Sequence, residues 1–313
     1  MKKKYDKKYA SIEQVQKGFE RIGYICNQQI ATTLFLSYHL DKPILVEGPA
    51  GVGKTALGQA TADYLGLSLI RLQCYEGLDE SKALYEWKYG KQLLYTQILK
   101  DKLNDVLQGA EGLAASMKRL REHDDLFFSP DFLEPRPLLE ALQADKGAVL
   151  LIDEVDKSDQ EFEAFLLEIL SEYQVSIPEI GTIKAKAKPF VFLTSNNTRE
   201  LSEALKRRCL HLFIPFPDPK LEVNILKVHI PDLSKHLGGQ LIEFIHRVRK
   251  LDLKKAPSVS EVIDWARVLM ILHASTLDPQ LIRDTFHTFL KFEEDIDIVK
   301  ENLYELTRNK AHG

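Results

Sequence analysis

The run from Gly48 to Thr55 has the pattern Gly-x-x-x-x-Gly-Lys-Thr, which carries the strongest chemical signal in this sequence. Glycines let the backbone turn tightly, so that successive N–H groups point at phosphate oxygens. Lys54 adds a positive charge for the β- and γ-phosphates, and the Thr55 hydroxyl is a ligand for Mg²⁺. The pattern therefore predicts that the chain binds ATP with Mg²⁺. The expected nucleotide-binding residues are Gly48, Pro49, Ala50, Gly51, Val52, Gly53, Lys54, Thr55 and Ala56.

The residues on either side of this loop have the local character that the motif needs. The apolar run at 43–46 predicts a buried strand, and residues 54–65 predict a helix. The positive N-terminal end of such a helix also faces the phosphates. The plain alternative is a chance glycine turn, but strand, full motif and helix together argue against it.

A second motif, Ala-Val-Leu-Leu-Ile-Asp-Glu at 148–154, indicates that the nucleotide is hydrolysed. Continuous apolar character is typical of a strand buried on both faces of a parallel sheet. We expect Asp153 to hold Mg²⁺ through its water shell and Glu154 to polarise the attacking water. The alternative is that these carboxylates cap the helix predicted at 159–172. Capping explains one acidic residue at a helix start, but not an adjacent pair after a buried strand.

A third group of polar residues follows the apolar strand predicted at 189–194. Asn196 comes just past the strand, where a polar side chain can orient the attacking water or sense the γ-phosphate. Arg207 and Arg208 lie on the short segment that leads to the next strand. The plain interpretation of an arginine pair is a solvated helix end.

Composition limits the class of protein. The chain has 313 residues, 44% of them hydrophobic, a formal net charge of −4 and a pI of about 6.2. This balance gives no reason to expect nucleic acid as the main partner. Three widely spaced cysteines fit a reducing compartment, and the Lys-rich N-terminus is not followed by the apolar core of a signal peptide. No run approaches the ~18 apolar residues of a membrane span. We expect a soluble cytoplasmic protein.

Strand-like and helix-like segments alternate along the chain, which predicts an α/β fold with a parallel sheet covered by helices. The Pro-Phe-Pro-Asp-Pro cluster at 215–219 predicts a hinge between an α/β domain (1–216) and a helical domain (217–313). The expected core strands are at 43–47, 68–73, 148–153, 189–194 and 211–215. The expected helical segments are 12–40, 54–65, 81–121, 159–173 and the residues from 220 on, with a hairpin at 175–184.

The order of these motifs resembles the AAA+ ATPases, a group of P-loop NTPases. Within them the chain resembles the MoxR branch, and in it the carbon monoxide dehydrogenase accessory ATPase (CoxD-type) subgroup. The similarity extends from about residue 19 to about residue 267. The stretches that carry it are Arg-Leu-Gln-Cys-Tyr-Glu-Gly-Leu-Asp at 71–79, Ala-Leu-Tyr-Glu-Trp at 83–87, Arg-Pro-Leu-Leu at 136–139, Ile-Pro-Glu-Ile-Gly at 177–181 and Thr-Ser-Asn-Asn-Thr-Arg-Glu-Leu at 194–201.

The resemblance implies a five-stranded parallel sheet flanked by helices and followed by a C-terminal helical lid. It implies rings, usually hexamers, in which an arginine of one subunit completes the ATP site of the next. Arg208 best matches that arginine finger, with Arg207 as the alternative. It also implies that Gln73 acts as a switch on Glu154, and that the hairpin at 175–184 is the helix-2 insert, which contacts substrate or partner.

One feature departs from the family pattern. Relatives carry Ser-Pro-Arg in the lid, where the arginine senses the nucleotide, whereas this chain has Pro-Ser-Val-Ser-Glu at 257–261. Arg267 is the substitute available on the following helix, and its alternative role is that of an exposed surface residue.

The resemblance implies a ring-forming ATPase that remodels or matures a client enzyme together with a von Willebrand A domain partner. The client it points to is a molybdenum hydroxylase such as carbon monoxide dehydrogenase, whose metal centre is assembled. A nucleic-acid motor or regulator is the alternative, because the same nucleotide-binding fold serves helicases and transcriptional activators. A nucleotide-dependent binding module without useful hydrolysis is a third possibility, which the intact Asp153-Glu154 pair weakens.

Overall fold

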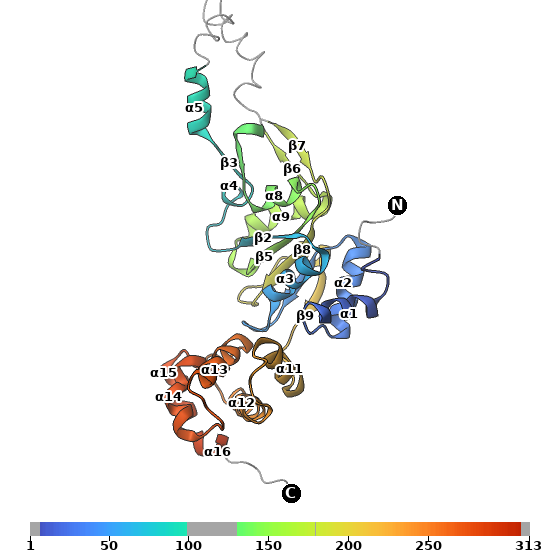
Figure 1. The fold of residues 1–313 in the computed structure, drawn as a ribbon. Helices are drawn as coiled ribbons and strands as arrows, with labels where there is room; N and C mark the ends of the chain where they lie inside the picture. Colours follow the sequence, from blue (N-terminus) through green and yellow to red (C-terminus); the bar gives the residue numbers. More distant parts are fainter. Residues whose placement is uncertain (1–6, 99–129, 179, 308–313) are drawn as a thin grey trace, which may run out of the picture. The chain divides into compact units, whose positions relative to one another are not determined.

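The computed structural model describes residues 7–98, 130–178 and 180–307. Its central feature is a five-stranded parallel sheet in the order β2-β5-β8-β1-β9, flanked by helices and followed by C-terminal helices (Figure 1). The strands are β1 (Ile44–Glu47), β2 (Ser68–Gln73), β5 (Ala148–Asp153), β8 (Phe190–Ser195) and β9 (Leu210–Phe213). The predicted α/β class and the five core strands are therefore confirmed.

The register of the sheet brings the ends of two strands level. In the parallel pair of β2 and β5, Gln73 lies opposite Asp153. Every residue of β5 is buried, as its unbroken apolar run predicted. β5 also pairs in parallel with β8, where Leu151 lies opposite Phe192. The polar residues that follow these strands are therefore presented at one edge of the sheet.

The chain forms two compact units, and each has a core of its own. The first unit comprises Met1–Thr32, Val46–Ala60 and His211–Gly313, and the second comprises Thr33–Leu45 and Thr61–Leu210. The predicted domain boundary between residues 216 and 217 stays a prediction.

In the second unit, helices pack against the sheet and against one another. α8 (Pro137–Gln143) packs on β2 and β5, while α9 (Gln160–Glu172) packs on α10 (Glu203–Arg208). Asp159 caps α9 by accepting the backbone N–H of Phe162 at 2.8 Å. α9 leads into an antiparallel hairpin of β6 (Gln174–Ile177) and β7 (Gly181–Lys184). Thus α9 and the hairpin together form the connection between β5 and β8.

In the first unit, the C-terminal helices enclose an aromatic core. Trp265 is fully buried, with its ring centroid 4.2 Å from that of Phe289 and 5.6 Å from that of Phe244. Its indole N–H donates to Thr285 at 2.9 Å, which satisfies the polar end of a buried side chain. The helices are α11 (Pro219–His229), α12 (Lys235–Val248), α13 (Val259–Ile271), α14 (Pro279–Phe289), α15 (Glu293–Glu301) and α16 (Leu303–Thr307).

Two expected helical segments differ from the structure. The segment 12–40 forms two helices, α1 (Ile12–Arg21) and α2 (Gln28–Leu40), separated by Gly23 at a φ of +80° that ends helical propagation. In the segment 81–121, α4 (Glu80–Ala83) and α5 (Tyr89–Ile98) flank a strand, β3 (Tyr85–Trp87). β3 pairs with β4 (Leu133–Pro135), so the prediction of a helix at these positions is wrong. The residues Tyr-Glu-Trp alternate aromatic and charged side chains, which suits a strand. The rest of that expected helix, 99–121, lies outside the described residues.

Among the described residues, no helix combines the length and the apolar character needed to cross a membrane.

Candidate nucleotide-binding and hydrolysis site

The phosphate loop lies between β1 and α3 (Lys54–Leu65), as its motif predicted. Lys54 is 7% exposed, and its ammonium group lies within the turn of the loop. Its Nζ donates to the carbonyl oxygens of Gly48 at 2.6 Å and Pro49 at 2.8 Å. The loop therefore holds one concentrated positive charge at the N-terminus of a helix, which is the arrangement that binds phosphate.

At two positions of the loop only glycine fits, because another segment of the chain lies very close to the backbone. A Cβ at Gly48 would lie 2.1 Å from the carbonyl oxygen of Ile214, and φ at Gly48 is +148°. A Cβ at Gly51, where φ is +72°, would lie 2.4 Å from the Cβ of Ser258. Any other residue at either position would clash with its neighbour and strain the backbone. The loop is thus packed tightly between the residues that follow β9 and the start of α13.

A cavity of about 490 Å³ opens beside the phosphate loop, within the first unit. Its volume lies in the range of ordinary small-molecule pockets, and its walls are mostly apolar with a few polar groups. The loop residues Gly51, Val52, Gly53 and Ala56 line one side. The other walls include Tyr24, Ile25, Asn27, Phe216, Asp218, Leu221, Ile225, His229, Ser260 and Ile263. An apolar cavity that continues from a phosphate loop fits the base and sugar of a nucleotide.

In the second unit, Asp153 ends β5 with its carboxylate held from two sides. Oδ1 accepts a short hydrogen bond from the hydroxyl of Thr194, and Oδ2 pairs with Arg71 at 2.5 Å. Thr194 is fully buried on β8, and Arg71 lies on β2. Both neighbouring strands therefore fix the orientation of the carboxylate that we predicted as the Mg²⁺ residue.

Glu154 has an unusual backbone conformation at the end of the same strand. Its φ of +56° and ψ of +49° are left-handed, which costs a residue with a side chain about 1–3 kcal/mol. Its backbone N–H donates to Oγ1 of Thr194 at 2.9 Å, which helps to hold this conformation. The consequence is a sharp turn after β5, so that Glu154 leaves the line of the strand.

The carboxylate of Glu154 is held at both oxygens. Asn196 donates its Nδ2 to Oε1 at 3.2 Å, and Gln73 donates its Nε2 to Oε2 at 3.0 Å. Lys157 pairs with Oε2 at 2.5 Å, and this hydrogen bond raises the pKa of the lysine. The structure thus brings together three residues predicted separately, Glu154, Asn196 and Gln73. Their catalytic roles stay predictions.

Asp156 anchors the loop that carries Asn196. Its Oδ2 accepts the backbone N–H of Asn196 at 3.2 Å, the backbone N–H of Thr198 at 2.9 Å and the hydroxyl of Thr198 at 2.6 Å. Burial by itself would raise the pKa of Asp156, but the hydrogen bonds from Thr198 and Asn196 outweigh it and lower the pKa below the ordinary value. The residue is therefore a charged clamp between the loops after β5 and β8.

The cysteines take no part as thiolates. Cys74 follows Gln73, and burial, reinforced by the nearby carboxylate of Asp153, raises its pKa to about 12. Burial also raises the pKa of Cys26 and of Cys209 to about 12. All three are free thiols and buried. At neutral pH they behave as small apolar groups rather than as nucleophiles.

Arg207 and Arg208 are both exposed at the end of α10. Nε of Arg208 donates to Oγ of Ser171 on α9 at 2.6 Å. Three basic residues in the last turn of α10 also complement the negative end of the helix dipole. The role of an arginine finger, and the choice between the two residues for it, stay predictions.

Arg267, the predicted substitute for a lid sensor, is exposed on α13 and pairs with Asp264 at 3.2 Å. It is not among the residues that line the cavity in the described part of the chain. The start of the same helix does reach the cavity, through Val259 and Ser260. Ser258 and Glu261 form a capping box there, which fixes this start beside the phosphate loop. Whether the lid has a sensor arginine, and whether Arg267 takes that role, stays untested.

Four residues around the carboxylates were not assigned a role from the sequence: Arg71, Asp156, Lys157 and Thr194. For two of them the sequence contains a signal from which a role could have been predicted. Thr194 is a polar residue at the end of an otherwise apolar strand, and Asp156 is a third acidic residue within three positions of Asp153. Arg71 and Lys157 look like ordinary exposed charges, so only the fold reveals their contacts.

Comparison with known proteins gives a family for these features. Residues 43–209, more than half of the chain, match the AAA domain of the dynein-related subfamily. Two proteins of Staphylococcus epidermidis, from strains ATCC 12228 and RP62A, are each 24% identical to the chain over 241 residues. The match covers 75% of this chain and 77% of each relative, and both relatives are described as uncharacterized proteins. The phosphate loop, the paired carboxylates and the matched domain show that this chain belongs to the AAA domain family, in its dynein-related subfamily.

Proposed function

We propose that this protein is a MoxR-type AAA+ ATPase that uses ATP hydrolysis to remodel or mature a client enzyme. The observation that carries the hydrolytic part is the carboxylate of Glu154, held by Asn196 and Gln73 at the end of the strand that also presents Asp153. Support for the MoxR assignment comes from the dynein-related subfamily, which includes MoxR-like ATPases, and from the specific stretches in the sequence.

Two observations support the proposal that the site binds ATP. The cavity beside the phosphate loop has the size and apolar lining for a nucleotide, and the close approaches at Gly48 and Gly51 give that loop a compact turn. In the proposed site Lys54 binds phosphate oxygens, and Thr55 and Asp153 hold Mg²⁺, which neutralises phosphate charge when bound. Glu154 orients and deprotonates water, while Asn196 orients Glu154 through its amide.

Two variants test the proposed roles of Lys54 in ATP binding and of Glu154 in hydrolysis separately. Lys54→Ala removes the positive charge of the loop, so we expect nucleotide binding to be lost in a titration with fluorescent ATP. Glu154→Gln keeps the shape of the side chain but cannot act as a base. We expect it to bind ATP as the wild type does and to release phosphate at least about 10²-fold more slowly. Normal turnover by Glu154→Gln, or unchanged affinity in Lys54→Ala, would refute the assignment of that residue.

The proposed client is a molybdenum hydroxylase such as carbon monoxide dehydrogenase, with a von Willebrand A domain protein as partner and a ring, usually a hexamer, as the active form. The test is deletion of the gene in its own host. We expect the activity of the hydroxylase to fall and to return with the wild-type gene but not with Glu154→Gln. Hydroxylase activity that survives the deletion would overturn the proposed client.

A simple assay distinguishes the proposed function from the alternative, a nucleic-acid motor or regulator. Phosphate release is measured with and without single-stranded DNA, double-stranded DNA and RNA at low salt, where nonspecific contacts are strongest. Because the chain has a net charge of −4, we expect nucleic acid not to stimulate phosphate release. A several-fold stimulation that depends on Glu154 would favour the alternative.

A further inference from the structure

The guanidinium group of Arg249 joins three segments in the first unit. Arg249 caps the end of α12, and its side chain is only 7% exposed. Its NH1 and NH2 donate to the two oxygens of Glu222 at 2.8 Å each, and Nε donates to the carbonyl oxygen of Pro257 at 2.8 Å. The guanidinium also lies 4.5 Å from the ring centroid of Phe216. All three nitrogens of this cation therefore donate a hydrogen bond, and an aromatic ring lies against the group.

One of these partners lines the nucleotide cavity, and the other two lie close in the chain to residues that line it. Phe216 lines the cavity directly. Glu222 lies on α11, whose neighbouring residues Leu221 and Ile225 line it as well. Pro257 immediately precedes the capping box of α13, where Ser258 packs against Gly51 of the phosphate loop. Arg249 itself is not among the lining residues, so it reaches the cavity only through its neighbours.

The chemistry of the contact requires an arginine. A planar guanidinium donates in parallel to a carboxylate and stacks on an aromatic ring at the same time, whereas an ammonium is a point charge without a plane. Glu222 is fully buried, and it also contacts Nε2 of His246 at 2.8 Å. A buried carboxylate of this kind needs well-placed donors, because an unpaired buried charge is costly. Lysine at 249 would keep the charge and lose the geometry.

We propose that Arg249 is a positioning residue for the nucleotide: by clamping Phe216, α11 and the residues around Pro257 it sets the width of the cavity. The inference rests on the proposed nucleotide site and concerns a residue that does not touch the ligand. The clamp contacts Glu222, Pro257 and Phe216, and none of these three belongs to the phosphate loop or to the carboxylates of the second unit. Loss of the clamp therefore weakens binding of the nucleotide more than it slows the chemical step at saturating ATP.

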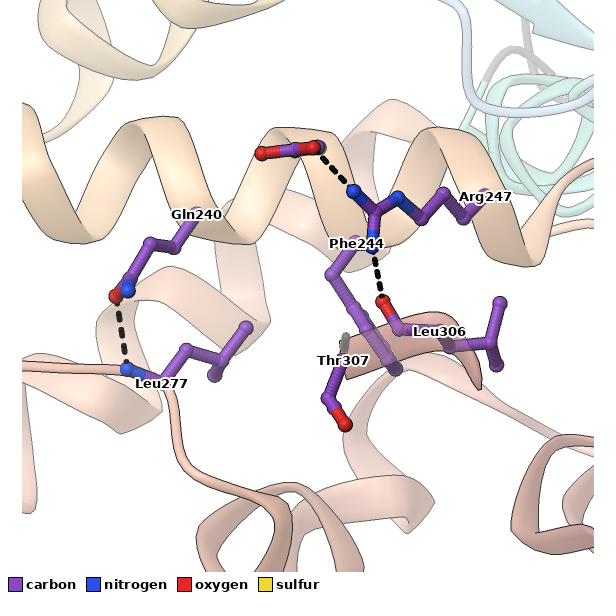
Figure 2. A pocket seen from close by; sticks show the side chains of 7 residues that line it. Gln240, Phe244, Arg247, Leu277, Leu306 and Thr307 are labelled. Carbon is purple, nitrogen blue, oxygen red and sulfur yellow. Dashed lines mark hydrogen bonds and ion pairs between the residues drawn. The ribbon is translucent and has the colours of Figure 1, made fainter. Parts of the chain in front are cut away.

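The chain provides a matched control in Arg247, two positions earlier on the same helix. Arg247 also donates to a backbone carbonyl, that of Leu306 at 2.8 Å, and pairs with a carboxylate, that of Glu243. Figure 2 shows these contacts at a different and smaller pocket, of about 150 Å³, which Arg247 lines together with Gln240, Phe244 and Leu277. Substitution there disturbs the same helix without disturbing the walls of the nucleotide cavity.

The test compares Arg249→Lys with Arg247→Lys in the full chain. The Kd for fluorescent ADP is measured at a temperature at which circular dichroism shows both variants folded, and KM and kcat for ATP are measured with Mg²⁺. We expect Arg249→Lys to raise Kd and KM at least about tenfold with kcat within about twofold of the wild type. We expect Arg247→Lys to change Kd by less than about twofold. If both variants have the same Kd for ADP and lose a similar amount of thermal stability, Arg249 contributes only to the stability of the fold. That result would overturn the inference.

A second variant covers the case in which Arg249→Lys does not fold. Phe216→Leu keeps an apolar wall but removes the ring, which both lines the cavity and lies under the guanidinium. We expect a weaker Kd for this variant, and a less than additive effect in the double variant if both fold, because the two side chains act through one contact. An unchanged Kd in Phe216→Leu would count against the clamp. If the wild type itself fails to bind ADP or ATP, both the proposed nucleotide site and this inference are refuted.

Discussion

The side-chain amide of Gln73 donates to Oε2 of Glu154 at 3.0 Å, although the two residues are 81 positions apart in the chain. The parallel register of β2 and β5 explains the meeting, because Gln73 lies opposite Asp153 and Glu154 is the first residue after β5, where the chain turns sharply. Arg71 supports the amide from behind by donating to its Oε1 at 2.8 Å. The orientation of the amide is thus determined by a neighbour on its own strand.

This contact predicts the effect of Gln73→Ala on turnover. The hydrogen bond from Gln73 fixes the carboxylate of Glu154 in one orientation and so restrains the base, and such a bond is worth about 0.5–1.5 kcal/mol. Its loss should raise the basal rate of phosphate release about two- to tenfold with ATP affinity unchanged. Gln280→Ala, on the exposed face of α14, is the control and should match the wild type. A rate that falls to the level of Glu154→Gln would show that Gln73 positions the base rather than restrains it.

Asp156→Asn should affect the loop that carries Asn196. An asparagine keeps the size of the side chain but weakens the three hydrogen bonds that Oδ2 accepts. Hydrogen bonds to a charged group are the stronger ones, so we expect a loss of about 2 kcal/mol in the free energy of unfolding at pH 7. ATP should still bind, and phosphate release should slow. The exposed Asp232→Asn is the matched control.

The same substitution has a defined pH dependence. The pKa of Asp156 in the folded chain is lowered below the ordinary carboxyl value. Its charge therefore contributes stability fully above the unfolded pKa, about 3.9, and this contribution is lost as pH falls through the folded pKa. Urea unfolding should show the full difference between wild type and Asp156→Asn at pH 6–7, and a smaller one at pH 3. A difference that stays constant down to pH 3 would contradict the charged clamp.

Arg208→Ala tests the proposed ring. If Arg208 completes the site of a neighbouring subunit, its loss should leave ATP binding nearly intact and cut hydrolysis by about 10³-fold or more. Mixing Arg208→Ala subunits with Glu154→Gln subunits should restore some activity, because certain mixed interfaces pair an intact Glu154 with an intact arginine. A mixture that stays inactive while the subunits co-assemble would exclude Arg208 as a trans-acting finger. Arg207→Ala is then the next variant to mix.

The sequence by itself determined the elements whose signal is local. The phosphate loop is encoded by glycines and a lysine at set spacing, and β5 by an unbroken apolar run before Asp153. The five core strands follow from similar runs. In each case the information lies within a few consecutive residues, because the strand or loop depends on its own side chains and backbone. The lid arginine expected from relatives was also visibly missing at 257–261.

Only the tertiary structure decided which side chains meet. β3 escaped prediction because it is only three residues long and its partner β4 is far away in the chain. Thr194 bonds Asp153, and Arg249 clamps Phe216, because strand register and helix packing bring them together. Periodicity and composition describe how a segment folds along the chain. Periodicity and composition do not give the distance in space between two residues that are far apart in the chain. That distance determines which side chains hold the carboxylates and the cavity walls.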